Sequence, residues 1–496
     1  MLNIKAIRDI MRQDAGVNGD AQRIEQIIWI LFLKIYDEYE KQRELKAQLD
    51  DKAYTSIIPQ ELSWDAWASG QKALTGDELL DFVNAKLIPT LKNLNITTET
   101  PLHQTQVKKA FEDINNYMKN GILLRRVIEE VDKLKILQGK EEDKKLSQIY
   151  ENFLKELQSA GKAGEFYTPR ALTDIIIHIL EPRLGDTVAD LACGTGGFLI
   201  SAYHYLEQKN LNKDNIPAEQ RSQLNKSFYG IEKKGLPFIL CATNFLINNI
   251  TESRLEHKNA FDFGNLSDLS TAEKFDIIAM NPPYGGTELK GIQEKFKPDF
   301  ASSETADLFM AIITERLKRG GKAAVVLPDG FLFGSDNAKI NLKKRLLNEF
   351  NLELILRLPS GIFAPYTPIA TNVLFFTNDP LGTQGVWFYR YDMPEGIKSF
   401  SKTKPVKFEH LESILHWWQD RQEVQDEKGN FKASFYSKAK LEERNYNLDL
   451  CGYVSEEEET LEPFALIEQI KEQRDKLNNT LDSLMNQIST IIKDNQ

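Results

Sequence analysis

Residues Asp190 to Phe198 read Asp-Leu-Ala-Cys-Gly-Thr-Gly-Gly-Phe, and they join an apolar run, Thr187 to Leu191, to the helical pattern Phe198 to Leu206. Short apolar runs bounded by glycine are typical of buried strands. The three glycines allow a tight turn and a close approach to a ligand, because glycine has no Cβ. The dinucleotide fingerprint GxGxxG would need a glycine in place of Leu199, so it is absent. The stretch predicts a strand, a turn and a helix of an α/β fold.

Acidic residues end two of the predicted strands. Asp190 stands four positions ahead of Gly194, and the next strand, Ser227 to Glu232, closes with Glu232. In nucleotide-binding folds an acid at such a position accepts hydrogen bonds from the ribose hydroxyls. This spacing favours S-adenosylmethionine as the ligand, with Glu232 on its ribose. The alternative is a purely structural turn, and the glycines taken alone do not separate the two.

A second motif, Asn281-Pro282-Pro283-Tyr284, follows the apolar strand Phe275 to Met280. Two prolines fix φ and stiffen the turn. The Asn281 side-chain oxygen and the Pro282 carbonyl can accept both hydrogens of an exocyclic amine and stabilise the positive charge that develops during methyl transfer. Tyr284 offers a flat face to a base rotated out of the duplex. A proline-rich turn without chemistry is the disfavoured alternative, and the two motifs together predict an amino-group methyltransferase.

A third stretch precedes a helix that we expect to begin near Leu172. Thr168 can cap this helix, and Pro169 suits its first turn. Backbone amides at such a helix start can hold a carboxylate, here that of the cofactor's methionine part. As composition alone the signal is weak, because an aromatic pair before a capped helix usually belongs to the core. The stretch comprises Glu165, Phe166, Tyr167, Thr168, Pro169 and Arg170.

The 496 residues divide into four predicted parts. Residues 1–160 carry apolar side chains at three- and four-residue steps and predict a helical domain. Residues 161–400 alternate short apolar runs with helical patterns, which indicates a parallel α/β sheet. Residues 401–455 form a mixed connecting region, and 456–496 an assembly helix. Beyond the strands already named, we expect strands at 323–327, 352–358 and 372–377.

The last part has a heptad pattern. One helix with a sustained apolar stripe needs a partner helix. Packing back on its own chain is the alternative. The stripe comprises Ile467, Ile470, Leu477, Leu481, Leu484, Ile488 and Ile491.

Charge and composition exclude several classes of protein. The net charge is −11, whereas a protein that holds DNA alone normally carries a basic footprint. Action on DNA would therefore require a partner that supplies most of the DNA-binding affinity. The longest apolar run, Ile27 to Leu33, is far short of the roughly 20 residues that span a bilayer. No secretion signal opens the chain, and three scattered cysteines with six histidines make no metal-ligand set, so we expect a cytoplasmic protein without a metal.

The motifs in this order resemble one family closely. GEFYTPR at 164–170, DLACGTGGFL at 190–199, YGIE at 229–232 and NPPY at 281–284 look like the modification subunit of type I restriction–modification systems, an N6-adenine DNA methyltransferase. The stretches 320–329, 356–363 and 371–376 are similar too. The resemblance spans roughly residues 1–400 and the C-terminal helix. It implies a class I S-adenosylmethionine-dependent methyltransferase core of Rossmann-like α/β fold, an all-helical N-terminal domain and a C-terminal coiled-coil-like helix.

The resemblance also implies the site. The catalytic residues would be Asn281, Pro282, Pro283 and Tyr284, acting on the N6 of an adenine flipped out of double-stranded DNA. The cofactor would be S-adenosylmethionine, held by Glu165, Phe166, Tyr167, Thr168, Pro169, Arg170, Asp190, Gly194, Thr195, Gly196, Gly197 and Glu232. In this family a separate specificity subunit chooses the DNA sequence and joins two modification subunits through helices, and restriction subunits can dock on the methyltransferase.

The chain departs from the family at three positions. Leu191 stands where proline is usual, and Tyr284 where many members have phenylalanine; both keep the chemistry. Asn259 stands where an aspartate is common, which leaves the contact to the cofactor's adenine open between Asn259 and Asp262.

Four other functions compete with this one. A protein glutamine methyltransferase also uses an NPPY turn, but it would not need the helical N-terminal domain or the heptad tail. A stand-alone enzyme would need its own recognition domain, for which residues 400–450 are too few. A non-catalytic assembly subunit would not need the intact Asn281 to Tyr284 motif. Cytosine C5 chemistry would need a nucleophilic cysteine after a proline, which the sequence lacks.

Overall fold

The computed structural model describes residues 3–70, 73–134, 146–154, 167–210, 217–270, 273–363, 369–397, 400–401 and 404–452, with single positions and pairs between 468 and 485. Residues 1–452 form one compact unit, and 453–496 form a second. No helix among the described residues is long and apolar enough to cross a membrane.

A ten-stranded sheet runs through the first unit in the order β3-β2-β1-β4-β5-β7-β6-β8-β10-β9. The strands are β1 (Val188–Asp190), β2 (Phe228–Glu232), β3 (Arg254–His257), β4 (Phe275–Met280), β5 (Leu317–Pro328), β6 (Asn351–Arg357), β7 (Thr371–Thr377), β8 (Gly385–Arg390), β9 (Val424–Gln425) and β10 (Phe431–Ser437). In β1, Val188 pairs with Phe228 on one side and with Ile277 on the other.

The prediction of a wholly parallel sheet is wrong at β7 and beyond β8. β1 to β5 are mutually parallel, but β7 runs antiparallel between β5 and β6. The connection from β6 to β7 contains no helix among its described residues, and a strand that returns directly beside its predecessor runs antiparallel. β10 is antiparallel to both β8 and β9.

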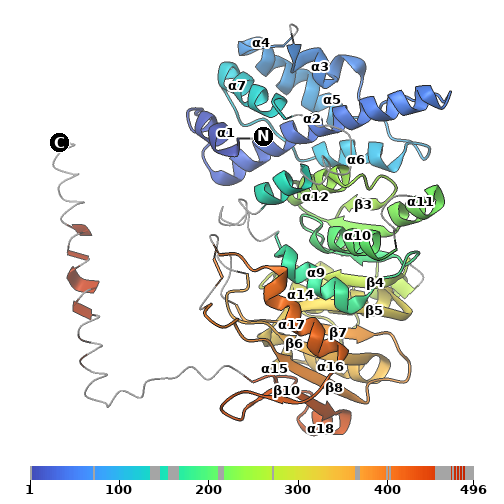
Figure 1. Ribbon diagram of the computed structural model, residues 1–496, viewed down its shortest axis with the longest axis vertical. Coiled ribbons are helices and arrows are strands. Elements are labelled where there is room, and N and C mark those ends of the chain that lie inside the picture. The colour runs from blue at the N-terminus through green and yellow to red at the C-terminus, as the bar shows by residue number, and fades with distance from the viewer. Residues whose placement is uncertain are drawn as a thin grey trace. The chain divides into compact units, whose positions relative to one another are not determined.

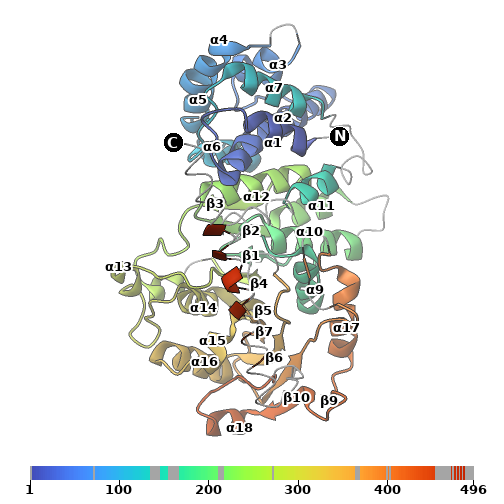
Figure 2. The ribbon, with the colours of Figure 1, turned by 90° about the vertical axis from the view of Figure 1, so that its left-hand side faces the viewer.

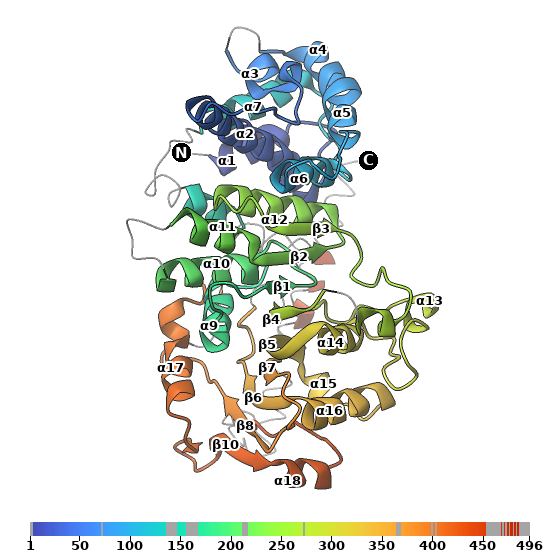
Figure 3. The ribbon, with the colours of Figure 1, turned by 90° about the vertical axis from the view of Figure 1, so that its right-hand side faces the viewer.

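Helices cover both faces of the sheet, as Figure 2 and Figure 3 show from opposite sides. One face carries α9 (Arg170–Leu180), α10 (Gly197–Asn210) and α17 (Phe408–Gln419), and the other α14 (Thr305–Arg316), α15 (Asp329–Phe333) and α16 (Asn337–Glu349). The remaining helices of this region are α11 (Ala218–Lys226), α12 (Gly235–Ile247), α13 (Lys290–Gln293) and α18 (Lys438–Glu443). Successive strand residues point to opposite faces, so Ile277 and Ile278 join two different hydrophobic clusters.

The N-terminal helices lie at the β3 end of the sheet, next to α12 (Figure 1). They are α1 (Ile4–Met11), α2 (Asp20–Leu49), α3 (Trp64–Trp67), α4 (Gly76–Asp81), α5 (Ile88–Lys92), α6 (Leu102–Phe111) and α7 (Gly121–Asp132). Their apolar side chains continue into the cluster on the α9 face. Polar contacts add to this packing: Tyr39 Oη donates to Ile247 O at 3.3 Å, and Lys109 Nζ pairs with Glu256 at 3.0 Å.

In the second unit, the described positions between 468 and 485 are helical. The side chains of Leu477, Leu481 and Leu484 are exposed. The other members of the predicted apolar stripe, Ile467, Ile470, Ile488 and Ile491, lie outside the described residues.

Candidate active site

A cavity of about 360 Å³ opens at the carboxyl ends of β1, β2, β3 and β4. It gathers residues from six separate stretches of the chain. Its lining consists of Thr168, Asp190 to Thr195, Gly197, Phe198, Ile231 to Lys234, Lys258 to Phe261, Asn281 to Tyr284, Gly286 to Glu288, Thr305 and Phe309.

A larger cavity of about 640 Å³ lies at the opposite edge of the sheet, where β2, β3 and β4 begin. It contains none of the residues that the sequence nominates. Ligands of open α/β sheets bind outside the carboxyl ends of the strands. The smaller cavity is therefore the candidate site.

The glycine-rich turn has the geometry that the sequence predicts. The backbone at Gly194 has φ +54° and that at Gly196 has φ +82°, a region that residues with a Cβ rarely adopt. A Cβ at Gly196 would lie 2.8 Å from the Sγ of Cys241. The turn thus needs glycine both for its conformation and for its close contact with α12.

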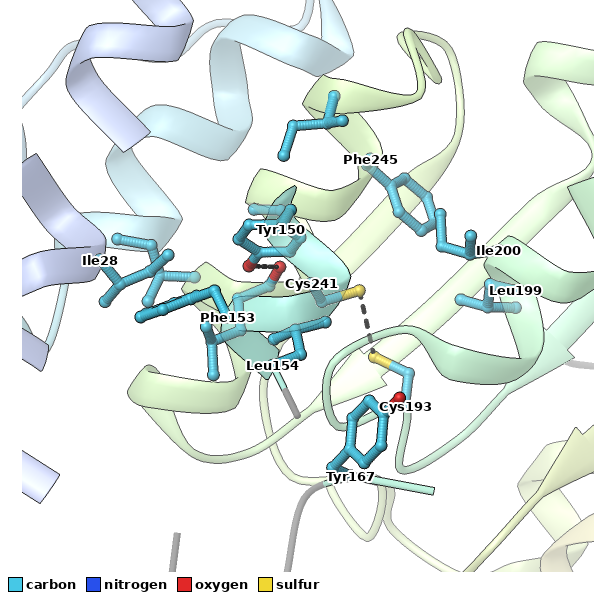
Figure 4. Close-up of a cluster of buried hydrophobic side chains, with 14 of the residues drawn as sticks. Ile28, Tyr150, Phe153, Leu154, Tyr167, Cys193, Leu199, Ile200, Cys241 and Phe245 are labelled. Atoms are coloured by element: carbon cyan, nitrogen blue, oxygen red, sulfur yellow. Dashed lines mark hydrogen bonds between the residues drawn. The ribbon is translucent and has the colours of Figure 1, made fainter. Parts of the chain in front are cut away.

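The turn rests on a hydrophobic cluster (Figure 4). Cys193 turns its side chain into this cluster, where its Sγ lies 3.8 Å from that of Cys241. Tyr150 Oη donates to Leu240 O at 2.7 Å. The contact with the Cys241 sulfur, together with burial, raises the pKa of the Cys193 thiol. A protonated, buried thiol is a poor nucleophile, and the side-chain contacts of Cys193 lie in the cluster that supports the turn.

Two buried carboxyls border the cavity at the ends of β1 and β2. Glu232 accepts hydrogen bonds from Gly194 N (3.0 Å) and Lys234 N (2.8 Å), and Asp190 accepts one from Ala192 N (3.1 Å). Burial raises the pKa of Asp190 to about 8. The hydrogen bond from Ala192 lowers this pKa, and the charge of Glu232 raises it further. Burial also raises the pKa of Glu232. A cationic ligand would favour the charged forms of both groups.

Of the described residues 167–170, only Thr168 lines the cavity. The prediction that Thr168 caps the following helix is wrong: α9 begins at Arg170, its N-cap residue is Pro169, and no side chain caps it. Arg170 donates to Gly197 O and forms an ion pair with Glu151, so it braces the glycine-rich turn from outside the cavity. Tyr167 is buried and donates to Glu151 at 3.3 Å. Glu165 and Phe166 lie outside the described residues.

The hydroxyl of Thr168 contacts Asn281 instead. Asn281 Nδ2 donates to Thr168 Oγ1 at 3.1 Å, and the Tyr284 hydroxyl donates to Asn281 Oδ1. Two stretches 113 residues apart are thereby joined at the carboxyl end of β4. Thr168 thus fixes the orientation of the amide, and the Asn281 oxygen, which accepts from Tyr284, has a second lone pair with which it can accept from a ligand.

The structure separates the two candidates for the adenine contact. Asn259 lines the cavity, whereas Asp262 is not part of the lining. Asn259 Oδ1 accepts from Phe261 N at 3.1 Å, which fixes the side chain in a turn. Of the two candidates, Asn259 is therefore the one at the cavity, with its side-chain oxygen held by the backbone.

Sequence reasoning missed part of the wall. Gly286, Thr287 and Glu288 line the cavity from the loop after β4, and Thr305 and Phe309 line it from α14. The only sequence signal was the length of the interruption between Gly285 and Thr305, since long loops in compact domains are often functional. Across the described ranges, no group of three His, Cys, Asp or Glu side chains is arranged to hold a metal ion.

Sheet order, cavity and motifs together define a class I S-adenosylmethionine-dependent methyltransferase fold. Two family descriptions match the chain: N-6 DNA Methylase over residues 141–462 and HsdM N-terminal domain over residues 3–131. The chain is 43% identical over 493 residues to the methylase subunit of the type I restriction enzyme EcoEI from Escherichia coli, a match that covers 99% of this chain and 96% of the relative.

Solved structures agree with this assignment. A protein from Vibrio vulnificus YJ016, assigned as a modification subunit of a type I restriction enzyme, shares 36% identity and a TM-score of 0.78, over 91% of this chain and 95% of that one. A second structure, solved to explain complex assembly and conformational transition of the type I restriction–modification system, shares 30% identity and a TM-score of 0.75. The match covers 98% of this chain and 97% of that one. The chain therefore belongs to the methylase subunits of type I restriction enzymes, which are adenine-specific N6 DNA methyltransferases.

Proposed function

We propose that this subunit transfers a methyl group from S-adenosylmethionine to the N6 amine of an adenine that has been rotated out of double-stranded DNA. The observation that carries the proposal is that Asn281, at the end of β4, lines the same cavity as Glu232 and the glycine-rich turn. A base bound at Asn281 would lie beside a ligand held at Glu232.

The residues present fit the cofactor. The positive-φ glycines leave room beside the backbone, the Glu232 carboxylate can accept from two neighbouring hydroxyls, and the two buried carboxyls suit a cationic ligand. S-adenosylmethionine supplies an electrophilic methyl group when bound. We assign the ribose to Glu232 and the adenine edge to Asn259, and we place Thr168 next to the reacting end through its contact with Asn281.

The reaction depends on hydrogen-bond acceptors. The lone pair of an adenine amine belongs to the ring, so the nitrogen is a weak nucleophile. Asn281 Oδ1 and the Pro282 carbonyl would hold its two hydrogens and stabilise the charge that develops on nitrogen. Tyr284, whose hydroxyl contacts Asn281, would stack its ring on the base.

The direct test of the proposal is product analysis. The complex assembled with its partner subunits is incubated with S-adenosylmethionine and duplex DNA, and the DNA is digested to nucleosides for mass spectrometry. We expect N6-methyladenine. N4-methylcytosine, or unmethylated DNA together with a methylated protein glutamine, would contradict the proposal.

Glu232→Ala should weaken cofactor binding by about tenfold or more. A hydrogen bond to a charged group is worth about 1.5–3 kcal/mol, and this variant removes the carboxylate that we place on the ribose. Calorimetry on the isolated subunit measures the affinity, with Glu219→Ala, an exposed acid on α11, as the control. An unchanged dissociation constant for Glu232→Ala would remove Glu232 from the site.

Thr168→Val should lower the methylation rate about three- to tenfold, because it removes the hydroxyl that holds the Asn281 amide. Thr168→Ser should keep the rate. If Thr168 acts through Asn281, the same substitution should have no further effect in an Asn281→Ala background. An equal loss in both backgrounds would show that Thr168 works independently of Asn281.

We further propose that sequence recognition comes from a specificity subunit that joins two copies of this chain, and that a restriction subunit can dock on the assembly. The exposed leucines of the tail support a partner helix. The net charge of −11 supports a partner that supplies the DNA-binding affinity. The boundaries 1–160, 161–400, 401–455 and 456–496 remain our proposal for the domains.

A further inference from the structure

An exposed leucine stands at the rim of the cavity. Leu289 is 79% exposed, and it directly follows Glu288, which lines the cavity. Consecutive Cα atoms are about 3.8 Å apart, so Leu289 begins one residue outside the site. A base that enters the cavity would bring its duplex against this rim.

The position of Leu289 is fixed by the chain on both sides. Glu288 N donates to Ser303 O at 2.9 Å, Thr305 N to Gly286 O at 3.0 Å, and Gln293 Nε2 to Glu288 O at 2.6 Å. Leu289 itself is the N-cap residue of α13. The exposed position of Leu289 is therefore held by the hydrogen bonds of the loop.

The far part of the loop is anchored to the core. Lys295 Nζ donates to Phe261 O at 2.8 Å, and the Phe296 ring packs against that of Phe261 with centroids 6.1 Å apart. Lys339 pairs with Glu304 at 2.8 Å and Asp307 at 2.9 Å. Figure 2 and Figure 3 show α13 standing out from the sheet on the α14 side. Because the loop is anchored to the core, it can hold an inserted side chain in the DNA without being displaced.

We propose that Leu289 enters the DNA duplex at the space that the rotated adenine leaves, and so holds the base in the cavity. Rotating a base out costs stacking and pairing energy, and proteins that deform DNA commonly insert an apolar side chain between base steps. Exposure of an apolar side chain to water is unfavourable, and insertion into the base stack would bury Leu289, which is 79% exposed at this rim. Lys290, the next residue, is exposed and can meet a neighbouring phosphate. This inference rests on the proposed function.

The test compares two duplexes. One carries the adenine that the wild-type complex methylates, paired with thymine; in the other the same adenine faces an abasic position and is already weakly held. Leu289→Ala should lower kcat/KM about tenfold on the paired duplex and stay within about threefold of wild type on the abasic one. Leu289→Met should retain activity on both. Leu381 is 82% exposed and does not line the cavity, so Leu381→Ala is the matched control and should change neither rate.

Wild-type activity with Leu289→Ala on the paired duplex would overturn the inference. An equal loss on both duplexes would also overturn it, because a wedge matters only while the base must be taken from the stack. The wild-type complex on the paired duplex tests the proposed function by itself, so the two failures are distinguishable.

Discussion

Asn281→Ala should lower the methylation rate of the assembled complex about 100-fold or more, while cofactor affinity stays unchanged. The variant removes an acceptor aimed at charge that develops only in the transition state, and removing one such group typically costs about 10²–10³ in rate. The turn itself should persist, because Pro282 and Pro283 fix its backbone. Single-turnover methylation measures the rate, and calorimetry measures the cofactor affinity.

The matched control is Asn430→Ala. This asparagine is exposed between β9 and β10, where its amide contacts only Asp426 among the described side chains. It should leave the rate unchanged. Turnover of Asn281→Ala close to that of wild type would contradict the mechanism.

Replacing Leu477, Leu481 and Leu484 together with aspartate should abolish assembly with the specificity subunit, and with it DNA methylation. All three are exposed on helical residues of the tail, so their apolar stripe is available to a partner helix. The isolated variant should bind S-adenosylmethionine as wild type does, since the cavity lies entirely within residues 168–309. Size-exclusion chromatography of the mixed subunits measures assembly.

Asn478→Ala serves as the tail control, because this exposed polar residue is not part of the leucine stripe. It should assemble normally. A triple-aspartate variant that still formed a fully active complex would show that the tail has no role in assembly.

The strands that position the site were predictable because each is an apolar run ended by chemistry-bearing residues. β1, β2 and β4 close with Asp190, Glu232 and the turn that begins at Asn281. β3 was missed because Arg254–His257 holds a single apolar residue, on the strand at one end of the sheet order. The antiparallel direction of β7 was hidden as well, since a strand's sequence does not specify the direction of its neighbour.

Other elements were missed for different reasons. β8 reads Gly-Val-Trp-Phe-Tyr-Arg, whose β-branched and aromatic residues are typical of a strand, so this sequence signal was available. β10 and α17 follow it in the region that sequence reasoning described only as mixed. β5 begins at Leu317, earlier than expected, because Leu317 pairs with Phe275; a register shift follows before Lys322 pairs with Ile277.

The candidate site was predictable where a motif stands directly after a strand. Contacts between distant stretches were not: no spacing rule joins Thr168 to Asn281, or Arg170 to Gly197 O. The loop residues Gly286 to Glu288 show no hydrophobic periodicity that would predict their position, and only the folded structure places them in the cavity lining. Choosing Asn259 over Asp262 likewise required the turn that places one of them in the lining.

The central claim is that the adenine to be methylated lies in this cavity against Tyr284. Photo-crosslinking tests it most directly: 5-iodouracil replaces the target adenine in the duplex, the complex is irradiated, and the crosslinked peptide is identified by mass spectrometry. Because the iodinated base couples to an aromatic ring stacked on it, we expect the crosslink at Tyr284 and its loss in Tyr284→Ala. A crosslink outside the cavity, unchanged in Tyr284→Ala, would contradict the account.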